Sequence, residues 1–362
     1  MIDTIVLSAG AAVLLTGAGL LIRSRSRLVG TFLCAAGLFG LVGGWLLAEG
    51  TSTVDAVKTG GLAGGAVVAL YALWLNDRRR RVEEDRHDLE SRKADYDRER
   101  VADERFARSV ELLGHAADQV RVGAMHAMVG LARSRPTYTQ TVLDVLCAYL
   151  RRPFAHPAFD LRPDDPDRAD VRFSDVWPVE RIAEANRERE VRRTAQGLIA
   201  ELVPRRDGHS ADRDPDRDAP RYDLDLTAAT LEYFGLRDRD LGRLVARRAR
   251  LLGGTRLRGL RVLGSALLSA AEFGGRLDLH GARFVEGLSL RDVTLRGTTD
   301  LSDVVIGEFA KLQLAEYAEI DATGMRVPAT SETTLPAGWH VEPSAEPGGG
   351  LGVIVREPTA NW

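Results

Sequence analysis

Few side chains in this sequence have the types and spacing that enzymatic or metal chemistry requires. His115 falls in a predicted turn and His126 in the middle of a predicted helix, and neither has another ligand at the spacing of a zinc site. Cys147 lies on the apolar face of a predicted helix, and a nucleophilic role would need a nearby base that the sequence does not reveal. We expect structural roles for these residues, with no catalytic residue, no metal and no cofactor.

Four aspartates offer the remaining opportunity for acid–base or metal chemistry: Asp223, Asp225, Asp238 and Asp240. They border the first coils of an apolar repeat, and acids at the corners of such repeats commonly form turns. The Gly-rich nucleotide-binding, Gly-x-Ser-x-Gly and His-Glu-x-x-His motifs do not occur in the sequence. The sequence therefore predicts a protein that is not an enzyme.

The repeat itself must position any functional surface. Apolar residues recur at every eleventh position in two interleaved series between 268 and 317, and upstream leucines recur at every fifth position. Residues five apart on a helix would point in widely different directions, so short strands separated by turns fit better. A short fixed period is typical of a solenoid whose stacked coils share one core. The predicted core ladder is Leu268, Phe273, Leu279, Phe284, Leu290, Leu295, Leu301, Ile306, Leu312 and Tyr317.

This pattern resembles the pentapeptide-repeat family, which places a Leu or Phe at the centre of each five residues and a small residue two positions earlier. That family folds as a right-handed, four-sided β-helix, and the resemblance implies this fold for residues 222–321. The alternation of five and six residues departs from the family pattern, and Ala246 interrupts the ladder. A different β-solenoid is the alternative, and the regularity of the coils is open.

Three uncharged stretches near the N-terminus are long enough to cross a bilayer. They cover residues 5–22, 28–48 and 59–75, close to the roughly 20 residues that a transmembrane helix needs. We predict three transmembrane helices within residues 1–76; the alternative is two, with the third stretch re-entrant or interfacial. Arginines in the first short loop and after the third stretch place the N-terminus outside and the later domains in the cytoplasm. The expected location is the inner (plasma) membrane.

Residues 77–102 mix acids and bases at helical spacing and predict a charged helical connector. Its single heptad row, Val82, Leu89 and Tyr96, lacks the second row that a two-stranded coiled coil needs. Paired small residues in the membrane stretches can bring helices close together. A homo-oligomer formed through the Gly-rich spans or the connector is thus one prediction, and tight packing within the unit is the other. The glycine pairs are Gly40 and Gly44, Gly60 and Gly64, and Gly61 and Gly65.

Residues 103–152 have a helical pattern of apolar residues, interrupted by a turn near Gly114 and by Pro136. The segment resembles the HEAT-like helical hairpin that precedes the repeats in many membrane-anchored bacterial pentapeptide-repeat proteins. Among the matching residues are Leu112-Leu113-Gly114 and Val145-Leu146-Cys147-Ala148-Tyr149. The remaining segments are predicted to be a loop (153–189), a helix that caps the first coil (190–203), a disordered loop (204–221) and a tail that covers the last coil (322–362).

The distribution of charge in the repeat indicates which classes of partner it can bind. Some pentapeptide-repeat proteins imitate DNA with a strongly acidic surface, whereas acids and bases nearly balance in residues 222–321, so DNA mimicry and a nucleic-acid partner are disfavoured. The first coils are rich in arginine, which could meet an acidic partner or anionic lipid, or could simply keep the corners polar. The predicted interaction patch is Arg243, Arg247, Arg248, Arg250, Arg256 and Arg258.

The sequence as a whole predicts an α+β multidomain membrane protein with N-terminal transmembrane helices, a HEAT-like helical segment and a C-terminal right-handed β-solenoid. The expected role is a non-enzymatic, membrane-tethered scaffold that presents the cytoplasmic solenoid to an unidentified protein partner. This rests on fold-level analogy and on the lack of a catalytic motif. The alternative is a membrane sensor or transducer that relays a signal from the transmembrane unit through the helical segment to the solenoid.

Overall fold

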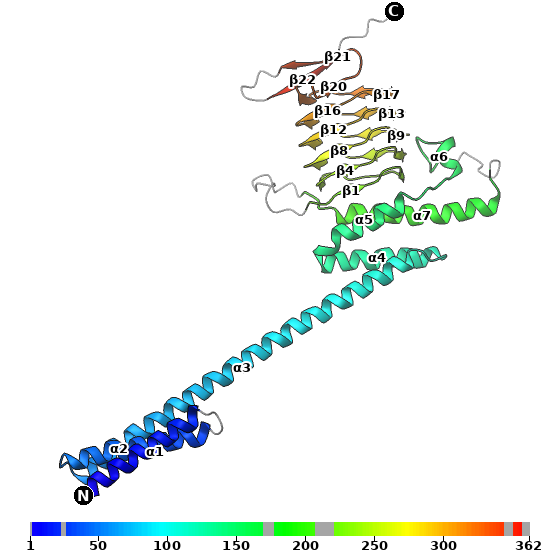
Figure 1. Ribbon diagram of the computed structural model, residues 1–362. Coiled ribbons are helices and arrows are strands. Elements are labelled where there is room, and N and C mark those ends of the chain that lie inside the picture. The colour runs from blue at the N-terminus through cyan, green and yellow to red at the C-terminus, as the bar shows by residue number, and fades with distance from the viewer. Residues whose placement is uncertain (1, 23–26, 169–176, 207–220, 344–349, 357–362) are drawn as a thin grey trace, which may run out of the picture. The chain divides into compact units, whose positions relative to one another are not determined.

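The computed structural model describes residues 2–22, 27–168, 177–206, 221–343 and 350–356. The chain divides into two compact units, Met1–Arg100 and Val101–Trp362. Helices make up the described part of the first unit, and the second combines helices with a stack of short strands (Figure 1). The architecture is therefore mixed α+β with a C-terminal β-solenoid, as the sequence predicts.

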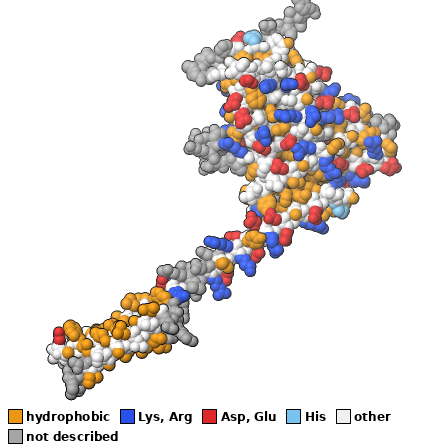
Figure 2. Space-filling model, viewed as in Figure 1, with side chains coloured by type: hydrophobic (Ala, Val, Ile, Leu, Met, Phe, Trp, Pro, Cys, Tyr) orange, Lys and Arg blue, Asp and Glu red, His pale blue; other side chains and the backbone are white. Residues whose placement is uncertain are grey.

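The N-terminal unit contains three helices that are long and apolar enough to cross a membrane, at Ile5–Ile22, Leu28–Ala48 and Thr53–Arg78. They belong to α1 (Ile2–Ile22), α2 (Arg27–Ala48) and α3 (Thr53–Leu112). Figure 2 shows apolar side chains over much of the surface of this part of the chain. Helix α3 is continuous, so the third apolar stretch, the predicted connector and the first helix of segment 103–152 are one element.

Glycines allow the helices of this unit to pack with their backbones in contact. A Cβ added to Gly37 of α2 would lie 2.5 Å from the Leu14 nitrogen of α1. On α3, a Cβ at Gly60 would lie 2.9 Å from the Phe39 oxygen of α2, and Gly64 meets α2 in the same way. The pair at 60 and 64 therefore serves packing within the unit. Self-association of copies stays a prediction.

The helical part of the second unit packs around one apolar core. Its members Met125, Met128, Leu143, Leu146 and Ile199 have essentially no exposed surface. After α3, the helices are α4 (Asp118–Ser134), the 3₁₀ turn η1 (Pro136–Tyr138), α5 (Thr139–Leu150), α6 (Pro157–Leu161) and α7 (Val179–Leu202).

Two features of this helical part differ from the sequence prediction. The predicted loop 153–189 contains α6, and the capping helix begins at Val179 rather than at residue 190. Helix α7 begins directly after Pro178, a residue that is well tolerated at a helix N-terminus. The first turns of α7 are highly charged, so the apolar pattern does not predict a helix there. The arginines that α7 buries have partners in other parts of the chain.

The described strands of the second unit form four sheets, and each full coil visits them in turn. The first sheet contains, in spatial order, β1 (Leu224–Asp225), β4 (Leu244–Val245), β8 (Ser265–Leu267), β12 (Gly287–Ser289), β16 (Phe309–Lys311) and β20 (Thr333–Thr334). The second contains β2 (Thr230–Glu232), β5 (Arg250–Leu252), β9 (Glu272–Phe273), β13 (Val293–Leu295) and β17 (Leu314–Tyr317).

The other two sheets close the coil on its remaining sides. The third sheet contains β6 (Thr255–Arg256), β10 (Leu277–Asp278), β14 (Thr299–Asp300) and β18 (Ile320–Asp321). The fourth contains β3 (Asp240–Leu241), β7 (Arg261–Val262), β11 (Arg283–Phe284), β15 (Val305–Ile306), β19 (Arg326–Pro328), β22 (Leu351–Arg356) and β21 (Trp339–Pro343). Figure 1 shows the strands stacked in layers.

Strand pairing explains the period of the apolar repeat. Leu277 pairs with Thr299, and Phe284 pairs with Ile306, so one full coil contains two periods of the apolar pattern. The first coil is shorter, because Leu224 pairs with Leu244, which lies closer to it in sequence. All pairs between successive coils are parallel, so each coil stacks on the one before it. The inward-facing side chains of the stacked coils form one continuous core.

Turns with a left-handed residue recur along the stack at two corners of the coil. Between the first and second sheets, Ala270 has a φ of 57°, and the Ala271 nitrogen donates to the Leu268 oxygen at 3.0 Å. Between the third and fourth sheets, Asp303 has a φ of 56° at the equivalent place. A positive φ in a residue other than glycine is uncommon, and its recurrence in successive coils marks these turns as a fixed part of the repeat.

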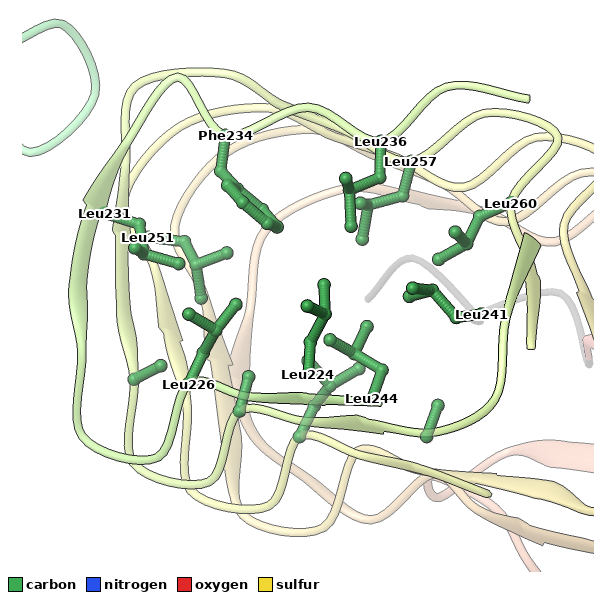
Figure 3. Packing of buried hydrophobic residues seen from close by; sticks show 14 of the residues in the cluster. Leu224, Leu226, Leu231, Phe234, Leu236, Leu241, Leu244, Leu251, Leu257 and Leu260 are labelled. Atoms are coloured by element: carbon green, nitrogen blue, oxygen red, sulfur yellow. The ribbon is translucent and has the colours of Figure 1, made fainter. Parts of the chain in front are cut away.

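The predicted ladder forms the core with one exception. Its members from Leu268 to Leu312 are at most 2% exposed, whereas Tyr317 is 37% exposed, so its assignment to the core is wrong. Tyr317 lies in β17, the edge strand of the second sheet, and the pairing of β17 with β13 contains a register shift. Figure 3 shows how leucines from the first coils point into the shared interior.

The C-terminal segment extends two of the sheets, the first through β20 and the fourth through a hairpin. Strand β22 is antiparallel to β19, and β21 is antiparallel to β22, so this hairpin extends the fourth sheet beyond residue 321. Trp339 and Ile354 from the hairpin join the core cluster. An edge strand is thereby covered, which limits edge-to-edge pairing. The predicted disordered loop 204–221 lies mostly outside the described residues.

Candidate functional site

The predicted arginine patch does not form one surface. Arg250 lies on the second sheet and Arg256 on the third, because residues five or six apart in a four-sided coil face different directions. Three members are engaged with carboxylates: Arg243 Nη2 is 3.5 Å from Asp223, Arg250 Nε is 3.3 Å from Glu272, and Arg258 Nε is 3.2 Å from Asp278. Arg243 lies before β4, and Arg247 and Arg248 lie at the corner after it.

The main concentration of buried charge lies where α7 meets the second sheet. Arg189 Nε donates to Glu232 Oε2 at 2.7 Å, and Arg193 Nη2 donates to the same oxygen at 3.1 Å. Both arginines also reach Asp167, at 2.8 and 2.6 Å. The Glu232 nitrogen donates to Gln196 Oε1 at 3.0 Å. The side chains of Arg189 and Glu232 are 9% and 4% exposed. Each charge therefore compensates the other, because a buried charge without a partner is strongly destabilising.

A second polar cluster joins α4, α5 and α7. Arg121 Nη1 donates to the Tyr149 hydroxyl at 2.9 Å and also contacts Glu188, and the Tyr149 hydroxyl lies 3.0 Å from Glu188 Oε1. Burial, followed by the Glu188 charge, raises the pKa of Tyr149 to about 12. The buried Arg192 donates to the Leu150 carbonyl at the end of α5. These contacts fix α7 against the helical hairpin.

A short segment after α5, which we call the strap (residues 157–168), crosses from the helices to the solenoid. Phe159 is 1% exposed and packs with Leu252 of β5. The Gly253 nitrogen donates to the Pro163 oxygen at 2.8 Å. A Cβ at Gly274 of the next coil would overlap that same oxygen, so this position requires glycine. The strap and the Arg189–Glu232 cluster connect the helices to the first coils, whereas the second cluster joins the helices to one another.

A cavity of about 460 Å³ opens between the α3–α4 turn and the start of α7. Its charged lining carries both signs, and Arg181 stacks 3.8 Å from the ring of Trp177. The described residues contain no group of three or more His, Cys, Asp or Glu arranged to hold a metal. The charged lining residues are Asp118, Arg121, Arg152, Arg181, Glu184, Arg187 and Glu188.

The aspartates near the first coils act in turns and ion pairs. Asp225 accepts from the Thr227 nitrogen at 3.0 Å and from the Thr227 hydroxyl at 2.6 Å. Burial opposes ionisation, but these hydrogen bonds and the Arg151 guanidinium lower the pKa of Asp225. Asp238 is itself a left-handed turn residue, with a φ of 53°. These placements agree with the predicted turn-forming role.

The other chemistry-bearing residues of the sequence lie apart. His115 Nδ1 accepts from the Ala117 nitrogen at 3.0 Å within the α3–α4 turn. His126 lies in α4. Cys147 is 2% exposed on α5, and burial raises the pKa of its thiol to about 12. A thiol of that pKa is almost entirely protonated at neutral pH and is a poor nucleophile.

The buried thiol gives a direct labelling prediction. In a Cys34→Ser background, Cys147 should react with a maleimide at pH 8 at least 100-fold more slowly than a thiol in denatured chain, because both access and thiolate formation are suppressed. The measurement is a mass-spectrometric labelling time course with and without denaturant. Equal rates in both states would show that α5 does not bury Cys147.

Comparison of the chain with protein-family models, curated proteins and solved structures gave no match. Function must therefore be argued from the geometry of this chain. That geometry consists of a β-solenoid fixed to the helices that precede it, together with helices able to span a membrane. We call the end of α3 together with α4, α5 and α7 the helical cap.

Proposed function

We propose that this protein is a non-enzymatic, membrane-tethered scaffold whose β-solenoid binds another protein. The observation that carries the proposal is the continuous attachment of the solenoid's first coils to the helical cap through α7 and the strap. A repeat whose coils share one core and whose end is fixed by buried ion pairs presents rigid outer faces. Rigid surfaces bind with a small entropic cost.

The resemblance of the repeat to pentapeptide-repeat proteins, and of segment 103–152 to their HEAT-like hairpin, supports the same proposal. Four sheets that each coil visits in turn are the arrangement that this resemblance implies. We extend the proposal to a bacterial inner-membrane protein with its N-terminus outside and the solenoid in the cytoplasm, on the basis of the arginines that flank the apolar stretches.

Deletion of the solenoid tests the scaffold proposal. Chemical crosslinking in native membranes, followed by affinity capture and mass spectrometry, compares the full chain with a chain that lacks residues 222–321. We expect at least one crosslinked protein to disappear with the deletion. Partners retained at unchanged yield by the deleted chain would contradict the proposal and would move the function to the membrane unit and the helices.

The continuity of α3 favours a second candidate, a membrane sensor or transducer. One helix contains the third apolar stretch and residues of the helical cap, where the Tyr138 hydroxyl donates to Asp103. Insertion of two glycines near residue 92 would interrupt the helix. If the protein is a transducer, this variant should lose its response to the signal. If the protein is a scaffold, the variant should still bind its partner. Capture of the same crosslinked protein by the variant would therefore favour the scaffold.

A further inference from the structure

The fourth sheet carries an outward column of arginines that differs from the predicted patch. Arg261 of β7 pairs in register with Arg283 of β11, and Val305 of β15 connects Arg283 to Arg326 of β19. Neighbouring strands in a sheet lie about 4.8 Å apart. Like charges placed directly opposite one another destabilise a sheet. Arg261 also lies in register with Asp240 of β3 on its other side, whereas neither Arg283 nor Arg326 has an acidic neighbour in register.

Within the described residues, acids on the second and third sheets form ion pairs with nearby arginines. On the second sheet, Glu272 lies 3.3 Å from Arg250 and 2.8 Å from Arg296. On the third sheet, Asp278 lies 3.2 Å from Arg258. Figure 2 shows acidic and basic side chains interspersed on the side of the solenoid that it presents. Arg256 of the third sheet is exposed, but it lies in register with Asp278 of the next strand.

The fourth sheet lacks this compensation at two of its arginines. Arg283 and Arg326 are exposed, and no carboxylate of the described residues lies within ion-pair distance of either one. Beside Arg283, Val285 is 49% exposed, although it lies outside the membrane unit and outside the helical segments. Val305 is half-buried between the two arginines. The face thus combines unmatched positive charge with exposed apolar surface.

We propose that this face of the fourth sheet, defined by Arg283, Val285, Val305 and Arg326, binds an acidic extended segment of a partner protein. The inference rests on the proposed scaffold function and names the binding surface and the partner chemistry. Arg283 and Arg326 lie two strands apart, or about 10 Å along the stack. A polyproline II segment repeats every three residues, about 9.3 Å. Carboxylates at every third position would meet both arginines while an apolar residue meets Val305.

Charge at the border of this face argues for a protein segment rather than a lipid surface. Glu286 and Glu308 are exposed at the corner that follows the fourth sheet, and Asp303 lies at the corner that precedes it. A continuous anionic bilayer would meet these carboxylates together with the arginines. A narrow peptide can place its acids on the arginine column alone. Recognition of charge by a small number of paired groups gives specificity.

The test uses a short fluorescent peptide with four Glu residues, one at every third position, and Val and Pro between them, together with its Lys counterpart. Binding to the detergent-solubilised full chain is measured by fluorescence anisotropy at two salt concentrations. We expect the acidic peptide to bind and the Lys peptide not to bind. The double variant Arg283→Glu/Arg326→Glu should weaken binding at least tenfold. The control Arg247→Glu/Arg256→Glu has the same change of charge at exposed arginines on other faces and should change binding less than twofold.

Three results would overturn the proposal: equal binding of the Lys peptide, equal weakening by the control variant, or no effect of Arg283→Glu/Arg326→Glu. A fourth is binding of phosphatidylglycerol vesicles that the double variant abolishes while peptide binding is unchanged, which would assign the face to lipid. Crosslinking separates this proposal from the scaffold proposal. A partner lost on deletion of residues 222–321 but kept by the double variant leaves the scaffold intact and removes the fourth sheet as its binding face.

Discussion

Replacing Leu279 with Arg is expected to unfold the solenoid. Leu279 has no exposed surface and directly follows β10, in line with Leu257 and Leu301 of the neighbouring coils. A guanidinium there would be buried without a partner in the core, which costs several kcal/mol. Because a typical domain is stable by only about 5–15 kcal/mol, we expect loss of the cooperative β-sheet transition in circular dichroism of the detergent-solubilised full chain.

The matched control at the same site is Leu279→Met, which keeps volume and apolarity and should cost less than about 1.5 kcal/mol. Limited proteolysis distinguishes local damage from global loss, since an unfolded solenoid is cut throughout residues 222–321. A wild-type melting transition for Leu279→Arg would show that the side chain at this position does not point into the shared core.

Removing the Glu232 charge is expected to loosen the attachment of the solenoid to the helical cap. Glu232→Gln keeps the shape of the side chain but leaves Arg189 buried with weakened compensation, since only the half-exposed Asp167 remains charged beside it. Breaking a buried ion pair by altering one partner typically costs about 3–5 kcal/mol. The retained contact to Asp167 places our expectation near the lower limit of that range, about 3 kcal/mol, in urea unfolding of the solubilised chain.

A double-mutant cycle separates this interaction from general damage. The loss in Arg189→Met/Glu232→Gln should be smaller than the sum of the single losses by about 1–3 kcal/mol, because contacting charges couple. Glu316→Gln, at an exposed position on β17 of the same sheet, should change stability by less than about 0.5 kcal/mol. Additive losses in the cycle would mean that Arg189 and Glu232 do not stabilise each other.

The sequence predicts the solenoid well because its core depends on a regular local pattern. A leucine or another large apolar residue at each step of the repeat is enough to place Leu268 to Leu312 inside, whatever the neighbouring segments do. The prediction that Tyr317 is buried is wrong because burial at this position depends on what covers the last coil. The β21–β22 hairpin extends the fourth sheet instead of the second. The pattern gives no information about which side a terminal hairpin selects.

The functional surfaces are harder to predict for a related reason. Proximity in sequence suggests that Arg243 to Arg258 form one patch, whereas neighbours on one face of the solenoid are separated in sequence by a whole coil. Reading the sequence at the interval of a coil aligns Arg261 with Arg283. The buried pair of Arg189 and Glu232 joins residues 43 positions apart in different elements. A run of charge in a sequence usually indicates a solvated helix, and only the tertiary partner reveals that an arginine is buried.

The register of the four sheets also determines how such a rod can change in length during evolution. Duplication or loss of one whole coil leaves every later strand in its own sheet, because a coil is the interval between paired strands. A change of half a coil would instead transfer each later strand to the opposite sheet. Leu268 directly follows β8 of the first sheet, and Leu279, half a coil later, directly follows β10 of the third, which shows this transfer. An arginine column or a terminal hairpin can therefore be moved farther from the helical cap only in whole-coil increments.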